Sequence, residues 1–144
     1  MVRVSYKNEG KNPLRRVLMH RPELEAAWDS MHRTFNDTAL LPAELLEEVR
    51  ATLAHGRGAK HCMSFGVPSE SLSDPRTCLA VRFALSILHD PAHIPESTWT
   101  ELKNQFSEAE LVELVFIICQ YIAVHLFGFL FDVDVPGQVF NIAE

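Results

Sequence analysis

The chain has 144 residues, of which 47% are apolar and 22% charged; these values are typical of globular proteins and exclude general disorder. Its length predicts one domain with one core. The net charge of −6 is uneven, because residues 1–21 carry six basic side chains and one acidic one, whereas the remainder is strongly acidic. An acidic body argues against a nucleic-acid partner, since phosphate contacts need clustered Lys and Arg. We interpret the basic segment as an arm lying on an acidic neighbour, with an acidic partner or phosphate as the alternative.

Strand signals are scarce, and from Pro13 onward the apolar residues recur at helical spacing. Caps, prolines and apolar stripes predict helices at about 22–36, 42–56, 74–89, 95–106 and 107–131. Gly56 is expected to end the second of these, and the region that follows it contains Cys62 within a short helical turn. We therefore predict an all-α, compact bundle of five or six helices forming one domain over 1–144, with an N-terminal arm at 1–12 and a C-terminal tail at 133–144.

The segment 115–131 is nearly all apolar and reaches the ~17 residues that a membrane-spanning helix needs. It contains Gln120, Tyr121 and His125, and no Lys or Arg follows Lys103, so the usual cationic anchor is missing at its far end. A helix that is apolar on all sides in a small chain is better explained by burial within the subunit plus a subunit interface. We therefore expect a homo-oligomer and no membrane partner.

Cys62, Cys78 and Cys119 are odd in number and widely spaced, which predicts free buried thiols in a reducing compartment rather than a disulfide framework. The first residues lack the apolar stretch of a signal peptide, so a cytoplasmic location is expected. His89 and His93 have no third ligand at a recognisable spacing, so no metal is predicted. There is no glycine-rich phosphate loop and no nucleophile elbow, and no cofactor is expected.

A series of landmarks follows in a fixed order over residues 13–132. They are Arg-Pro-Glu-Leu at 21–24, Leu-Pro-Ala-Glu-Leu-Leu-Glu-Glu-Val-Arg at 41–50, the cysteine turn at 59–66, Asp-Pro-Arg at 74–76 with Leu-Ala-Val-Arg-Phe-Ala at 79–84, and Phe-Ser-Glu-Ala-Glu-Leu-Val-Glu-Leu at 106–114. This order resembles the alkylhydroperoxidase-D and carboxymuconolactone decarboxylase superfamily. The resemblance implies an all-helical subunit that assembles into trimers or hexamers, with pockets near the subunit contacts.

The redox branch of this superfamily uses a relay of a glutamate, two cysteines in a Cys-x-x-Cys motif and a histidine. The resemblance places the glutamate at Glu47, the first cysteine at Ala59, the second at Cys62 and the histidine at Gly66. Half of the relay is therefore missing. A thiolate that attacks peroxide becomes a sulfenic acid, which a neighbouring thiol must resolve, and alanine cannot do this.

Cys62 has two interpretations. It is either a thiolate favoured by Lys60, by protonated His61 and by the start of a helical turn, or a small, chemically quiet residue buried under Met63 and Phe65.

Glu47 also has two interpretations. Leu45, Val49 and Leu53 define a helix face from which Glu47 points away, so helical geometry makes it a solvated surface acid. The resemblance instead implies a proton relay that faces a pocket, which an oligomer interface could supply.

Tyr121 and His125 lie one turn apart on the most apolar helix and share a face. They form either a buried acid–base pair or a pair of core side chains hydrogen-bonded to the backbone.

The first functional hypothesis is a cofactor-free enzyme of the carboxymuconolactone decarboxylase type, which decarboxylates or isomerises a small organic acid or lactone. Its candidate residues are Glu47, His61 and His125 as general acid–base groups, Cys62 as a polarising group, and Phe65 and Tyr121 as substrate contacts. The second hypothesis is a single-cysteine peroxidase or reductase in which Cys62 is resolved by an external thiol. The third is a non-catalytic oligomeric binding protein.

Overall fold

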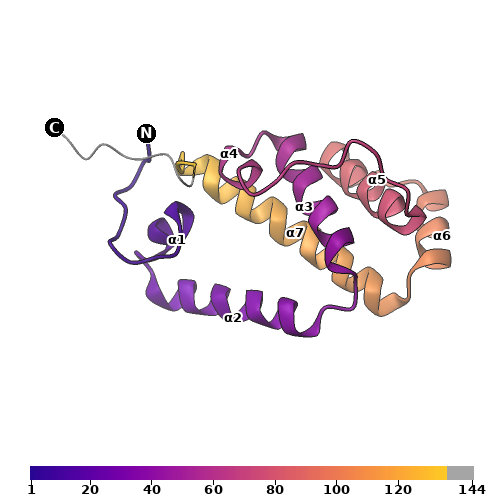
Figure 1. The fold of residues 1–144 in the computed structure, drawn as a ribbon, viewed down its shortest axis with the longest axis horizontal. Coiled ribbons are helices and arrows are strands. Elements are labelled where there is room, and N and C mark those ends of the chain that lie inside the picture. The colour runs from indigo at the N-terminus through magenta and orange to yellow at the C-terminus, as the bar shows by residue number, and fades with distance from the viewer. Residues whose placement is uncertain (136–144) are drawn as a thin grey trace.

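The computed structural model describes residues 1–135, and this part of the chain is all-helical with no strand (Figure 1). Its helices are α1 (Pro13–Leu18), α2 (Pro22–Thr38), α3 (Ala43–Arg57), α4 (Lys60–Met63), α5 (Pro75–His89), α6 (Glu96–Gln105) and α7 (Glu108–Leu130). The predicted all-α class is confirmed. The seven helices in the described range exceed the predicted five or six because α1 and α4 are too short to show a full apolar stripe.

The core forms where α3 packs against α5 and α7. Its fully buried side chains come from all three helices, among them Leu53, Phe83 and Ile118. Figure 1 shows α7 running through the centre of the molecule, with α1 and α2 on one side and α3, α5 and α6 on the other. The helix α3 packs against α4, α5 and α7, and α7 packs against α3 and α6.

The end of α3 differs from the prediction, because Gly56 continues the helix and Gly58 ends it. Gly58 has a φ of 64°, a left-handed conformation that glycine adopts without a Cβ penalty, and its N–H returns to the last carbonyls of the helix. Gly56 has a packing role instead: a Cβ at this position would lie 2.9 Å from Cδ1 of Leu88. The helix therefore continues past Gly56 to Arg57, and α4 begins shortly afterwards at Lys60.

The basic N-terminal segment contacts acidic groups of its own chain. Arg15 is buried and pairs with Glu25 and Asp29, each at 2.7 Å. The Tyr6 hydroxyl donates to Asp134 at 2.6 Å, which ties the arm to the residues that follow α7. The predicted tail begins within the described part at 133–135, and its residues 136–144 lie outside the described residues.

The helix α7 is long and apolar enough to cross a membrane by length and composition, and 33% of its most apolar 18-residue window is buried. The buried third packs on the core, whereas Val112, Phe116, Leu126 and Leu130 are exposed. No residue of α2 is buried in this structure either. The expected all-round burial of α7 is thus not provided by the single chain.

The start of α7 carries the predicted capping box, in which the Ser107 side chain accepts from the Glu110 amide and Glu110 accepts from the Ser107 amide. We predict that Ser107→Ala lowers the free energy of unfolding by about 1 kcal/mol, because it removes the partner of an otherwise unpaired amide. Urea unfolding followed by circular dichroism measures this. Ser71→Ala, in the exposed loop after α4, is the control and should change the midpoint little; equal effects of both substitutions would contradict the capping role.

Candidate functional site

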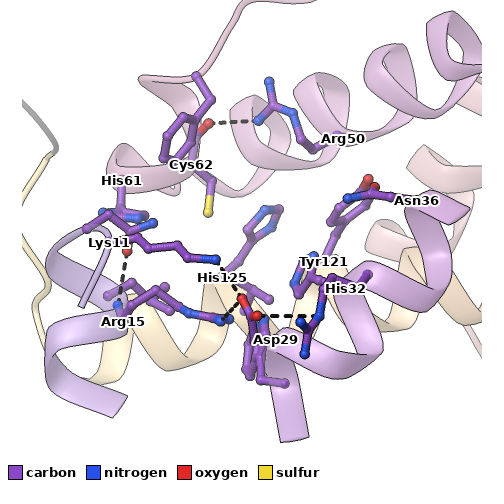
Figure 2. A pocket seen from close by; sticks show the side chains of 16 residues that line it. Lys11, Arg15, Asp29, His32, Asn36, Arg50, His61, Cys62, Tyr121 and His125 are labelled. Atoms are coloured by element: carbon purple, nitrogen blue, oxygen red, sulfur yellow. Dashed lines mark hydrogen bonds and ion pairs between the residues drawn. The ribbon is translucent and has the colours of Figure 1, made fainter. Parts of the chain in front are cut away.

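A cavity of about 360 Å³ opens between the N-terminal helices and α3, α4 and α7 (Figure 2). Five of the six site residues expected from the sequence line it: His61, Cys62, Phe65, Tyr121 and His125. The structure thus brings together two side chains of α4, Phe65 just after α4, and two side chains of α7. Figure 2 shows the Cys62 sulfur and the His125 imidazole pointing into the same space.

The short helix α4 positions His61 and Cys62. Both are buried, and after the turn at Gly58 the helix α4 packs against α3. The His61 Nδ1 lies 2.9 Å from the Asp134 carbonyl oxygen, which only accepts, so Nδ1 carries the proton and Nε2 keeps its lone pair. Phe65 packs edge-on against the imidazole with ring centroids 5.5 Å apart. Burial lowers the pKa of His61, with the Asp134 carbonyl opposing it, so the ring is neutral at neutral pH.

Cys62 is a buried thiol rather than a thiolate. Burial raises the pKa of this thiol to about 11, and the charge of Arg50 opposes the rise only in part. Arg50 donates to the Cys62 carbonyl at 2.9 Å, so its guanidinium is committed to the backbone and not to the sulfur. A reactive cysteine needs a lowered pKa. The electrostatics therefore favour the quiet interpretation of Cys62 over the nucleophilic one.

All three cysteines are free, as expected, but only Cys62 is buried. The expectation that Cys78 and Cys119 are buried is wrong, because each lies on the solvent side of its helix. Cys78 borders a surface hollow beside Arg82, and Cys119 lies on the face of α7 opposite the cavity. Within residues 1–135 no other thiol lines the cavity, so the resolving partner absent at Ala59 is not replaced.

Tyr121 and His125 both face the cavity from α7, as their one-turn spacing predicted. His125 is 3% exposed, and its Nδ1 has no hydrogen-bond partner among residues 1–135, which does not fit the interpretation of a core histidine bonded to the backbone. Burial, and then the charges of Arg57 and Arg50, lower the pKa of His125 to about 4. Burial also raises the pKa of Tyr121, so its phenol stays protonated. The cavity wall thus holds a neutral imidazole with an uncommitted nitrogen beside a neutral phenol.

Glu47 does not line this cavity. Its side chain is 54% exposed and binds Arg50 through both oxygens at 2.7 Å, which lowers the pKa of the carboxyl. A Cβ at Gly66 would lie 3.0 Å from the Glu47 carboxylate, so the acid sits beside the backbone position where the redox pattern places a histidine. The structure therefore agrees with the surface acid deduced from helical geometry, and Glu47 reaches the cavity only through Arg50.

Several charged lining residues were not expected from the sequence. They are Lys11, Arg15, Asp29, His32, Arg33 and Arg50. The cations are all ion-paired: Lys11, Arg15 and Arg33 with Asp29, Arg15 also with Glu25, and Arg50 with Glu47. Arg50 stands three residues after Glu47, a spacing that predicts their ion pair; the contribution of α1 and α2 depends on tertiary packing and has no local signal.

Metal binding finds no support in residues 1–135, where no group of three His, Cys, Asp or Glu side chains could hold an ion. His93 is exposed and pairs with Asp90 at 2.8 Å.

Comparison with known proteins yields a fold relationship. Neither the protein-family models nor the curated proteins gave a match. A structural match is the debrominase Bmp8, in a variant form in complex with 2,3,4-tribromopyrrole. The match has a TM-score of 0.75 at 17% sequence identity and covers 88% of this chain and 78% of the debrominase chain. The chain therefore shares the all-helical fold of that protein.

The raised pKa of Cys62 generates a prediction about thiol reactivity. At pH 7.5 iodoacetamide should alkylate exposed Cys78 and Cys119 well before Cys62, because only a small fraction of the buried thiol is ionised. Peptide mass spectrometry over a time course measures the order. Unfolding in urea should make the three rates similar. Alkylation of Cys62 as fast as Cys78 in the folded protein would show that it is a thiolate after all.

The lowered pKa of His125 predicts a pH-dependent stability. From about pH 6.5 down to about pH 4 the unfolded chain binds a proton at this residue and the folded chain does not. Stability should therefore fall with decreasing pH, and between pH 7 and pH 5 this residue should account for about 2 kcal/mol. Urea unfolding of the native protein and of His125→Gln at both pH values isolates this contribution, since His32 and His61 are common to both. An equal loss in both proteins would contradict it.

Proposed function

We propose that this chain is a cofactor-free enzyme of the alkylhydroperoxidase-D and carboxymuconolactone decarboxylase superfamily, which moves protons on a small organic acid or lactone. The observation that carries the proposal is the buried, neutral His125, whose Nδ1 has no partner within residues 1–135. The same cavity is lined by the protonated side chains of Tyr121 and Cys62. The fold supports an enzyme of this kind, since the structural match is itself an enzyme with an alkylhydroperoxidase-D-like fold.

The cationic rim suits an anionic substrate. Lys11, Arg15, Arg33 and Arg50 line the cavity, and their ion-pair partners are the three carboxylates Asp29, Glu25 and Glu47, so the set keeps one more positive than negative charge to attract a carboxylate. Once bound, the same carboxylate raises the pKa of His125 towards neutrality, because a nearby negative charge stabilises imidazolium. Substrate binding would thus convert a weak base into one matched to neutral pH.

Each cavity residue then has a role in proton transfer. His125 removes a proton from an acidic C–H of the substrate or returns one to carbon after decarboxylation. Tyr121 donates a hydrogen bond to the substrate carbonyl oxygen, where the electron pair accumulates, and the Cys62 S–H is a second, weaker donor. His61, with its lone pair on Nε2, is an alternative base. Phe65 provides an apolar contact for the substrate body.

The single-cysteine peroxidase is the alternative. It requires Cys62 to ionise, and burial works against that. It also requires an external thiol, since Cys78 and Cys119 lie away from the cavity. A non-catalytic binding protein is the remaining alternative, but it gives no reason for a buried His125 Nδ1 that has no hydrogen-bond partner within residues 1–135. We further propose a cytoplasmic homo-oligomer, a trimer or hexamer, whose contacts cover the exposed apolar residues of α7.

Hydrogen–deuterium exchange at substrate carbon tests the proposal. Small β-keto acids, unsaturated diacids and lactones are incubated with the protein in D₂O and followed by proton NMR. The native protein should accelerate exchange or decarboxylation of at least one of these compounds, and His125→Gln should lower that rate by about 10²-fold or more. Glu70→Gln is the carboxyl control and should retain the native rate, because Glu70 is exposed and lies outside the cavity.

Two results would contradict the assignment. His125→Gln with the native rate would remove the proposed base. Formation of a sulfenic acid on Cys62, with peroxide consumption that Cys62→Ser abolishes, would establish the peroxidase instead. Bromopyrroles belong in the same ligand screen, because the structural match is a debrominase in complex with a tribromopyrrole.

A further inference from the structure

A second cavity, of about 170 Å³, adjoins the candidate site between α2, α3 and α7. We call it the annex; its large apolar lining residues are Phe35, Leu41, Leu46, Ile117 and Val124. Among residues 1–135, no Lys, Arg, Asp or Glu side chain lines the annex, whereas several line the candidate cavity. The two spaces therefore differ in polarity: one is charged and the other is apolar.

The annex and the candidate cavity share part of their walls. Two residues of α2 and two of α7 line both spaces: His32, Asn36, Tyr121 and Val124. Figure 2 shows His32, Asn36 and Tyr121 together at the end of the candidate cavity that lies away from His61. Along α7, the stretch from Ile117 in the annex to His125 in the candidate cavity spans about 12 Å at 1.5 Å per residue. One bound molecule can therefore occupy both spaces by passing Tyr121.

The walls of the annex are held in place by contacts between α7 and the N-terminal half of the chain. The Glu113 carboxylate on α7 accepts from the backbone amides of Leu40 and Leu41 at 3.0 and 2.8 Å, which ties the connection between α2 and α3 to α7. On α2, the Phe35 ring contacts Phe116 with ring centroids 5.4 Å apart. The annex is therefore a pre-formed apolar space, as is usual for a small-molecule site.

The size and the polarity of the two spaces define what fits them. A protein cavity of about 150 Å³ lined by Leu, Ile and Phe takes up benzene, so the annex has room for an apolar group of about the size of a phenyl ring. The ion-paired set at the candidate cavity keeps one more positive than negative charge, which attracts a carboxylate. A molecule that satisfies both spaces is acidic at one end and apolar at the other.

We infer that the annex is the subsite for the apolar group of the substrate, and that the substrate is an amphipathic acid whose phenyl-sized group lies across Tyr121 from its carboxylate. The inference rests on the proposed function for the position of the carboxylate. It narrows the substrate class from small organic acids in general to acids with one apolar substituent. Tyr121, at the junction, lies beside the carbon atoms that connect the two ends.

Binding measurements test the subsite without requiring turnover. The native protein is titrated with propanoate, 3-phenylpropanoate and 5-phenylpentanoate at neutral pH, and heteronuclear NMR gives the three dissociation constants. At least one phenyl acid should bind about tenfold more tightly than propanoate, because burial of the ring adds to the same carboxylate contact. In the bound state the ring protons should show NOEs to the methyl groups of Ile117, which line the annex but not the candidate cavity. They should show none to Leu14, which lines the candidate cavity but not the annex.

Filling the annex provides a matched comparison. Ala39 and Ala43 line the annex and are exposed, so Ala39→Leu/Ala43→Leu adds two larger side chains there without replacing a core residue. This double variant should reduce the preference for the phenyl acid from about tenfold to about twofold or less, and it should keep the native affinity for propanoate. The control is Ala26→Leu/Ala109→Leu, at exposed alanines outside both cavities, which should bind all three acids as the native protein does. Both variants should keep the native circular dichroism spectrum.

The outcomes separate the subsite from the proposed reaction. Equal affinities for propanoate and both phenyl acids, ring NOEs to Leu14, or an unchanged preference in Ala39→Leu/Ala43→Leu would overturn the subsite and leave the reaction standing. Annex-dependent binding, with no exchange or decarboxylation of any test compound, would support the subsite and contradict the reaction. Failure of all three acids to bind would overturn the inference together with the expected anionic substrate.

Discussion

The packing of α7 and α5 against the shared helix α3 is the constraint on which the rest of the structure depends. This contact buries Leu114 and Ile118 in the core and, on the same helix, fixes the depth of Tyr121 and His125. Their desolvation follows from the position of the helix and not from any special local motif. Because burial penalises the charged form of each group, the protonation states of the cavity are a direct consequence of core packing.

The fold could be predicted from the sequence to a large extent, because its signals are local. The capping box at Ser107, the proline at the start of α5 and the apolar stripes each identify an element without knowledge of its neighbours. The end of α3 was misplaced because two glycines compete there, and only packing against Leu88 shows that Gly56 belongs inside the helix. The exposure of Cys78 was likewise set by tertiary packing, which a thiol in an apolar segment does not reveal.

The candidate site could be predicted only where it lies on one helix or one turn. Tyr121 and His125 share a helical face, so their convergence follows from their spacing. The contribution of Arg15 and Asp29 could not be found in this way, because α1 and α2 reach the cavity through long-range packing. The ion pairs that Arg15 forms beside the cavity are therefore a result of tertiary packing.

The two departures from the redox pattern act together. Position 59 carries alanine where that pattern has its first cysteine, and position 66 carries glycine where it has a histidine. Glu47 pairs with Arg50, and Arg50 binds the Cys62 carbonyl, so these two contacts link α3 to α4. This bond joins α3 to α4, which packs against it, and the Cys62 thiol on α4 stays desolvated, with a raised pKa.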